Sequence, residues 1–135
     1  FKQNLAGVPL TVVGDGTQRR DFIYVTDVAK GFLAAAETSF KGETYNIGAD
    51  NPQSVNRLVE LLGCEAQYIP KRPGEPDCTW ADITKARIQL NWQPVVSFED
   101  GVARMLEDIN EWRDAPLWTP ETIAEATDTW FKTLS

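Results

Sequence analysis

The stretch PLTVVGDGTQRRDFIYVTDVAKGFLAAA, residues 9–36, decides the fold that we expect for this chain. A short apolar run comes first and leads into a turn with the sequence Gly-Asp-Gly at 14–16. Residues of these types accept the positive φ of a tight turn. Side-chain character then alternates over 20–25, which predicts a second strand. Thr26 is a favourable N-cap for an amphipathic helix over 26–38. The order is strand, turn, strand and helix, with two adjacent arginines at the start of the second strand.

The rest of the chain alternates short strands with capped helices. Ser54 is typical of an N-cap, and Gly63 is typical of the residue that ends a helix. An extended loop with three prolines and one glycine occupies 70–77. We expect an α/β fold in a single domain over 1–135, with strands at 10–13, 20–25, 43–47 and 66–69 and about five helices, at 26–38, 54–62, 82–90, 97–112 and 119–134.

Composition excludes several classes of function. The formal net charge is −7, so general binding to nucleic acid or to an anionic membrane is not expected. Histidine is absent, which removes Ser-His and Cys-His nucleophiles and histidine metal ligands, and we expect no metal site. Cys64 and Cys78 fit no common zinc or redox spacing, so two free thiols in the reducing cytoplasm are expected. Because Phe1 begins within a helix-like pattern, we expect the chain to be a fragment.

Arg20 and Arg72 are the candidate binding residues. A guanidinium offers a planar fork of donors that fits phosphate oxygens and stays charged at any working pH. Two arginines on separate loops therefore suit a pyrophosphate. Judged by residue type alone, surface arginines in weak ion pairs are the commoner situation.

Three ordered motifs carry a resemblance to a known family. They are GDGTQRRDFIYVTDVAKG at 14–31, GETYNIGA at 42–49 and KRPGEPDCTWADITKARIQLNWQP at 71–94. Over residues 1–112 the chain resembles the C-terminal, substrate-binding part of extended short-chain dehydrogenase/reductases, the NAD-dependent nucleotide-sugar epimerases and dehydratases. The resemblance implies a Rossmann-type α/β fold, with Arg20 and Arg72 holding the pyrophosphate of a nucleotide sugar such as a UDP-sugar.

The same resemblance suggests roles for three further residues. Glu75 stands where the family usually has aspartate, a position that can accept hydrogen bonds from ribose hydroxyls; a solvated loop carboxylate is the alternative. Phe22 could pack on a base or sugar, although core packing is the commoner role of such a side chain. Asn46 corresponds to a strand end near the nicotinamide side of the cofactor.

Two family motifs are absent from the sequence. None of Tyr24, Tyr45 and Tyr68 has a lysine four residues on, so no Tyr-x-x-x-Lys is present, and Gly14-x-Gly16 is no dinucleotide fingerprint. We expect no catalytic residue here and NAD only in an intact enzyme, which leaves the enzymatic status of the chain open.

The expected function is the nucleotide-sugar-binding portion of an enzyme that oxidises and re-reduces the sugar at C4, inactive alone. A 4-epimerase is preferred over a dehydratase because Val28 replaces a histidine typical of dehydratases. A stand-alone, non-catalytic module that binds a nucleotide or a protein is the alternative, and a folded fragment without a ligand is a third reading. The apolar faces of 26–38 and 54–62 would lack cover, so we expect self-association, most simply a homodimer.

Overall fold

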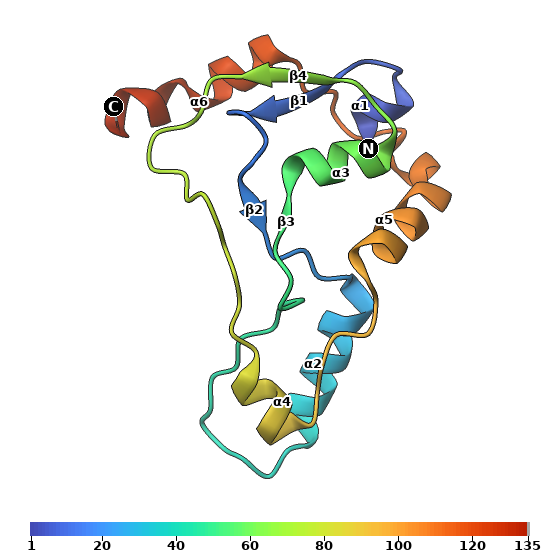
Figure 1. The fold of residues 1–135 in the computed structure, drawn as a ribbon, viewed down its shortest axis with the longest axis vertical. Coiled ribbons are helices and arrows are strands. Elements are labelled where there is room, and N and C mark those ends of the chain that lie inside the picture. Colours follow the sequence, from blue (N-terminus) through green and yellow to red (C-terminus); the bar gives the residue numbers. More distant parts are fainter. Residues whose placement is uncertain (135) are drawn as a thin grey trace. The chain divides into compact units, whose positions relative to one another are not determined.

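The computed structural model describes residues 1–134, and these form two compact units (Figure 1). The sheet unit comprises residues 1–18, 54–77 and those from Val102 onward. The α2–α4 unit comprises residues 19–53 and 78–101. Each unit has its own architecture and is described separately.

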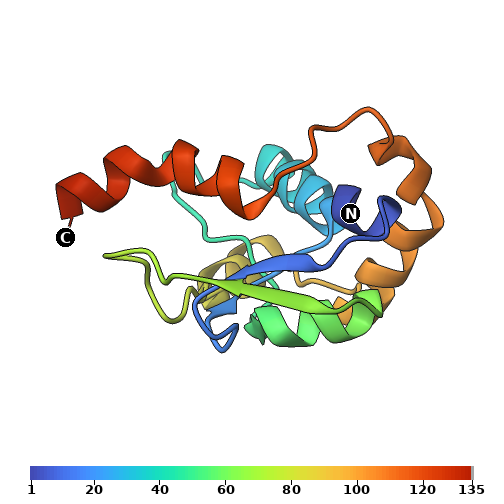
Figure 2. The same cartoon turned by 90° about the horizontal axis from the view of Figure 1, so that it is seen from above.

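In the sheet unit, β1 (Leu10–Val13) pairs in parallel with β4 (Ala66–Ile69), and Figure 2 shows the two strands side by side. Leu10 and Val12 are buried, because alternate residues of a strand point to the same side. A parallel pair needs a crossover connection, and α3 lies in it. The helices of this unit are α1 (Lys2–Leu5), α3 (Val55–Leu62), the 3-10 helix η1 (Ile109–Trp112) and α6 (Pro120–Leu134).

The capping predictions hold for α3. The Ser54 hydroxyl accepts a hydrogen bond from the backbone N–H of Arg57 at 3.0 Å. Gly63 ends the helix in the left-handed region, with φ of 65°, where glycine avoids the steric cost that other residues meet. Both ends of α3 are therefore fixed by local residue type.

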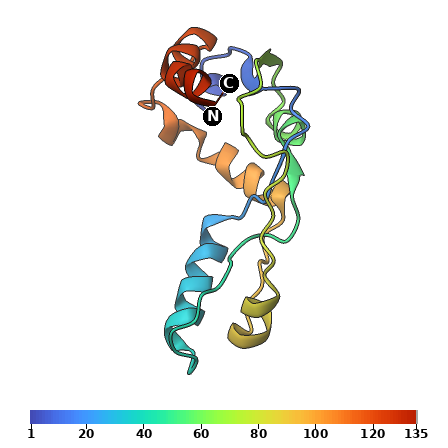
Figure 3. The ribbon, with the colours of Figure 1, turned by 90° about the vertical axis from the view of Figure 1, so that its left-hand side faces the viewer.

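The α2–α4 unit is built on two helices that lie side by side in Figure 3, α2 (Val25–Glu37) and α4 (Thr84–Leu90). Its buried apolar cluster lies on and around α4, and partly buried residues of the segment 43–48 pack against it. A further helix, α5 (Phe98–Glu107), begins in this unit. The cluster consists of Ile83, Ala86, Leu90 and Trp92.

Asp27 anchors the unit from within. Its side chain is fully buried, and Oδ2 accepts backbone hydrogen bonds from Val95 at 2.9 Å and Val96 at 2.8 Å. Lys30 lies one turn further on α2, with Nζ 3.6 Å from Oδ1. The indole of Trp92 donates to the Asp27 carbonyl at 3.1 Å. Asp27 lies in the first turn of α2, and its carboxylate holds the segment that follows α4.

Two predicted strands differ from the structure. Of the strand predicted at 20–25, only Arg20 lies in a strand, β2 (Arg19–Arg20), which pairs with β3 (Gln53–Ser54). The helix α2 already begins at Val25. No strand is assigned over 43–47 in the described part of the chain. Alternating side chains mark any extended segment, whereas a strand also needs a hydrogen-bonded neighbour. These segments have the side-chain pattern without the partner.

The outer face of α2 is apolar. Phe32 is 73% exposed and Leu33 is 63% exposed, on the side of the helix opposite the buried Asp27 and Gly31. On α3, by contrast, the predicted apolar residues are half-buried. Within residues 1–134, no helix combines the length and the apolar character needed to cross a bilayer.

Candidate functional site

The loop at 70–77 follows β4 in the sheet unit and carries two of the predicted site residues, Arg72 and Glu75. Lys71 and Asp77 form an ion pair across the loop. The hydrogen bond that the Lys71 ammonium donates to the Asp77 carboxylate raises the pKa of Lys71 above its ordinary value of 10.5, so this side chain stays positively charged at neutral pH. The backbone N–H of Glu75 reaches the Arg72 carbonyl at 3.4 Å, a long turn contact.

A shallow hollow lies between this loop and the glycine turn after β1. In that turn the Asp15 carboxylate accepts hydrogen bonds from the Thr17 hydroxyl at 2.6 Å and the Thr17 N–H at 2.9 Å, and these bonds lower the pKa of Asp15. Glu75 lies among the lining residues, with charges of both signs beside it. The lining is Val13, Gly14, Asp15, Thr17, Gln18, Lys71, Glu75, Pro76 and Asp77.

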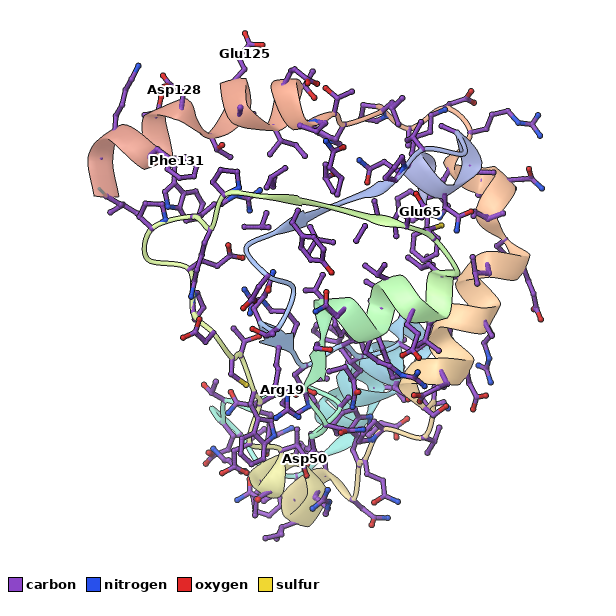
Figure 4. All side chains as sticks on the ribbon, turned by 45° about the horizontal axis from the view of Figure 1, so that its top comes forward. Arg19, Asp50, Glu65, Glu125, Asp128 and Phe131 are labelled. Carbon is purple, nitrogen blue, oxygen red and sulfur yellow. The ribbon has the colours of Figure 1, made fainter. Side chains whose placement is uncertain are left out.

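Arg72 lines a different groove, between the end of β4 and α6. In Figure 4, Phe131 points from α6 toward the segment that follows β4, and Glu125 points away from it. Within the described part of the chain, the half-buried Arg72 guanidinium has no hydrogen-bond or ion-pair partner. An unpaired guanidinium at the rim of a mostly apolar groove is a ready anion-binding group. The lining is Ile69, Pro70, Arg72, Pro120, Ile123, Ala124, Thr127, Asp128 and Phe131.

In the α2–α4 unit, the two neighbouring arginines have different surroundings. Arg19 donates hydrogen bonds from Nε at 3.1 Å and from Nη2 at 2.6 Å to the Pro52 carbonyl, so its guanidinium binds the backbone at Pro52. Arg20, the predicted site residue, donates from Nη1 to the Arg19 carbonyl at 2.8 Å. Arg19 therefore has a structural role, while a ligand-binding role of Arg20 stays a prediction.

Asp21 is the residue of this region whose role the sequence did not reveal. Its carboxylate accepts hydrogen bonds from four backbone N–H groups. Oδ1 accepts from Ala49 at 3.1 Å and Asn51 at 3.2 Å, and Oδ2 accepts from Asp50 at 3.3 Å and Ala81 at 3.1 Å. Asp21 thus joins two loops that are far apart in sequence.

The loop near Asp21 is also close-packed. A Cβ atom placed on the buried Gly48 would lie 2.5 Å from the Cβ of Ala81 and would overlap the Asp21 carboxylate. Glycine is therefore the residue that fits there. In the sequence, Asp21 stands out only as an aspartate directly after two arginines. That position does not indicate its hydrogen-bond partners, which are 28 to 60 residues further along the chain.

Phe22 and Asn46 lie in the same unit as Arg20. Phe22 is half-buried and stacks on Phe98, with ring centroids 5.0 Å apart and an interplanar angle of 26°. Asn46 is exposed, donates from Nδ2 to the Asp82 carbonyl at 3.2 Å, and lines an open depression with Gly48 and Trp80. The stacking of Phe22 gives it a packing role, and its contact with a base or sugar stays a prediction.

The predicted site residues are thus divided between the two units. Arg72 and Glu75 share one loop of the sheet unit, although they line different hollows, and Arg20, Phe22 and Asn46 belong to the α2–α4 unit. Within residues 1–134, no group of three or more metal-ligating side chains is placed to hold a metal ion. The chemistry that these residues offer is recognition of an anion.

Comparisons with known proteins give a consistent picture. A family model described as the NAD dependent epimerase/dehydratase family matches residues 1–48. The uncharacterized UDP-glucose epimerase YtcB of Bacillus subtilis is 43% identical over 109 residues, which cover 76% of this chain and 34% of that protein. The UDP-glucuronate 4-epimerase of Thermodesulfobacterium geofontis is 39% identical over 106 residues, covering 71% of this chain and 32% of that protein.

Solved structures that are similar to this chain are epimerases as well. UDP-glucuronic acid 4-epimerase of Bacillus cereus, in complex with UDP-glucuronic acid and NAD, matches with a TM-score of 0.76 and 39% identity, covering 82% of this chain and 38% of that one. UDP-glucose 4-epimerase of Thermotoga maritima, with UDP-glucose, matches with a TM-score of 0.76 and 35% identity, covering 82% of this chain and 37% of that one. These similarities confirm the predicted α/β, Rossmann-type fold class. The chain spans about a third of the length of the curated relatives that it matches.

Proposed function

Because this chain belongs to the NAD-dependent epimerase/dehydratase family, we propose that it is the nucleotide-sugar-binding portion of such an enzyme. The solved relatives bind UDP-glucuronic acid or UDP-glucose, and a UDP-sugar is the ligand proposed for this chain. In the intact enzyme the sugar would be oxidised at C4 and reduced again. Both compact units belong to this one portion in the proposal, since both carry predicted ligand-binding residues.

The observation that carries the proposal is the Arg72 guanidinium, which has no hydrogen-bond or ion-pair partner among residues 1–134. A half-buried arginine normally finds a carboxylate or carbonyl partner, because an unused donor out of bulk water costs free energy. The carboxylates of Asp77 and Asp128 are paired with Lys71 and Lys132 respectively, and not with Arg72. A pyrophosphate oxygen would satisfy the donors of Arg72. Arg20, Glu75 and Phe22 are the other residues proposed to bind the nucleotide sugar, Glu75 in the sheet unit and Arg20 and Phe22 in the α2–α4 unit.

The residues present do not fit a cradle for NAD. Gly14 and Gly16 have φ of 67° and 75° and form the turn from β1 to β2, where a dinucleotide loop would instead lead into a helix. A Cβ on Gly16 would overlap the side chain of Asn56, so close packing explains this glycine. With no Tyr-x-x-x-Lys in the sequence either, we propose that the chain alone neither binds NAD nor turns over a sugar. A contact from Asn46 to the cofactor would arise only in an intact enzyme.

Assembly and location complete the proposal. The exposed apolar face of α2, with Phe32 and Leu33 at its centre, suits a self-associating surface, and a two-fold homodimer would bury it twice. Cys64 and Cys78 are free thiols, which suits the reducing cytoplasm.

Calorimetric titration of the purified chain with UDP tests the proposed function. We expect weak binding, and Arg72→Ala should reduce the affinity roughly ten- to a hundredfold, since a lost bond to a charged group costs about 1.5–3 kcal/mol. Arg113→Ala is the matched control. It also removes one arginine charge, at an exposed position just after η1, and it should leave the affinity unchanged. Absence of UDP binding would contradict the proposal, and equal affinities of wild type and Arg72→Ala would remove Arg72 from the site.

A further inference from the structure

The C-terminal helix α6 packs directly on the loop that carries Arg72. The indole Nε1 of Trp130 donates a hydrogen bond to the Pro73 carbonyl at 2.8 Å. Phe131 and Ile123 line the groove together with Ile69 and Pro70, so aromatic and aliphatic side chains of the helix meet the start of the loop. The family motifs of the sequence end at Pro94, which leaves α6 without an assigned role.

We propose that α6 is a positioning element for Arg72, and that Trp130 is the positioning residue that fixes the loop backbone beside it. The inference rests on the proposed function, because it names how the anion-binding side chain is held. Arg72 and Pro73 are neighbours in sequence, so a bond that fixes the Pro73 carbonyl also restricts the peptide that follows Arg72.

Two of the contacts within the loop itself are weak. Its internal contact between Glu75 and Arg72 is long at 3.4 Å, and the ion pair of Lys71 and Asp77 joins two exposed side chains. Exposed ion pairs fix a loop weakly, because solvent screens them and ordering two long side chains costs entropy. The hydrogen bond from α6, at 2.8 Å, therefore gives the loop a well-formed attachment point directly beside Arg72.

The groove also explains how Arg72 can be ordered and still available. Its aliphatic stem can lie along the apolar lining while the charged end stays at the rim. Asp128, the acidic residue of the lining, is paired with Lys132 at 2.5 Å one turn along α6. The helix thus orients the arginine without neutralising it, and preorganisation of this kind lowers the entropic cost of binding an anion.

Trp130→Phe removes the indole donor and keeps an aromatic ring, so it tests the inference without emptying the groove. Hydrogen–deuterium exchange of the unliganded full chain should show the segment 70–77 exchanging about two- to tenfold faster, the range set by one net hydrogen bond. UDP affinity should fall by a similar factor. Trp118→Phe is the matched control, because its side chain is also half-exposed but makes no hydrogen bond within residues 1–134, and it should change neither measurement.

The exchange measurement decides the inference even if the proposed function fails. Unchanged exchange over 70–77 in Trp130→Phe would overturn the positioning role, whatever the affinity for UDP. Faster exchange with unchanged UDP affinity would overturn it as well, because the loop would then be held without consequence for the site. If the wild type binds no UDP, the proposed function is lost, whereas faster exchange over 70–77 in Trp130→Phe would still show that α6 positions the loop.

Discussion

Replacement of Asp21 by asparagine is the sharpest test of how the α2–α4 unit is held together. Each oxygen of the Asp21 carboxylate accepts two backbone N–H groups, Oδ1 from Ala49 and Asn51 and Oδ2 from Asp50 and Ala81. An amide has only one oxygen. Whichever way the new side chain is oriented, its NH₂ group faces two backbone donors and leaves them without an acceptor.

The expected loss of stability follows from that count. A hydrogen bond to a charged group contributes about 1.5–3 kcal/mol, and the lower end applies here because Asp21 is only half-buried. Two lost bonds at about 1.5 kcal/mol each should therefore lower the free energy of unfolding by about 3 kcal/mol, which is large for an isosteric substitution.

Urea unfolding followed by circular dichroism measures this difference as a shift in the midpoint at constant slope. Asp114→Asn is the control, because it makes the same chemical change at an exposed position for which no partner is found within residues 1–134. A loss of less than about 0.5 kcal/mol for Asp21→Asn, in the range of ordinary surface substitutions, would refute the idea that Asp21 joins the two loops.

Two further predictions concern pH and association. The side-chain and backbone hydrogen bonds of Thr84 lower the pKa of Asp82 below 3.8. The ionised carboxylate therefore stabilises the fold above that pH, and this stabilisation is lost as pH falls through the lowered value. The difference in stability between wild type and Asp82→Ala should therefore shrink in urea titrations below about pH 4, and a constant difference would contradict it. Sedimentation velocity should show concentration-dependent self-association that Phe32→Glu abolishes, and a monomer at every concentration would argue against the exposed face of α2 as an interface.

Local chemistry made much of the fold predictable. Ser54 and Gly63 set the ends of α3 through contacts within a few residues, and the parallel strands at 10–13 and 66–69 follow from short apolar runs. The segments 20–25 and 43–47 show the limit of this reasoning. Their side chains alternate as in strands, but whether a ladder forms depends on a neighbouring segment that the pattern does not specify.

The candidate site was predictable only in part. Arg72 and Glu75 could be assigned to one loop because they are close in sequence. The roles of Asp21 and Asp27 could not be assigned, because their acceptor oxygens serve backbone groups up to 60 and 69 positions away. Trp130 is similar, since its partner Pro73 is 57 residues distant in the chain. Contacts of such long range follow from the packed structure and not from local residue type.

Nuclear magnetic resonance on a mixture of the chain, NAD and UDP-glucose tests the central claim most directly, because one sample reports both binding and chemistry. The account predicts saturation transfer from the protein to the UDP-glucose protons, and no anomeric signal of the C4 epimer above a mock preparation. The first result follows from the proposed anion site around Arg72, and the second from the missing Tyr-x-x-x-Lys and glycine-rich loop. Absence of saturation transfer, or steady growth of the epimer signal, would contradict the account.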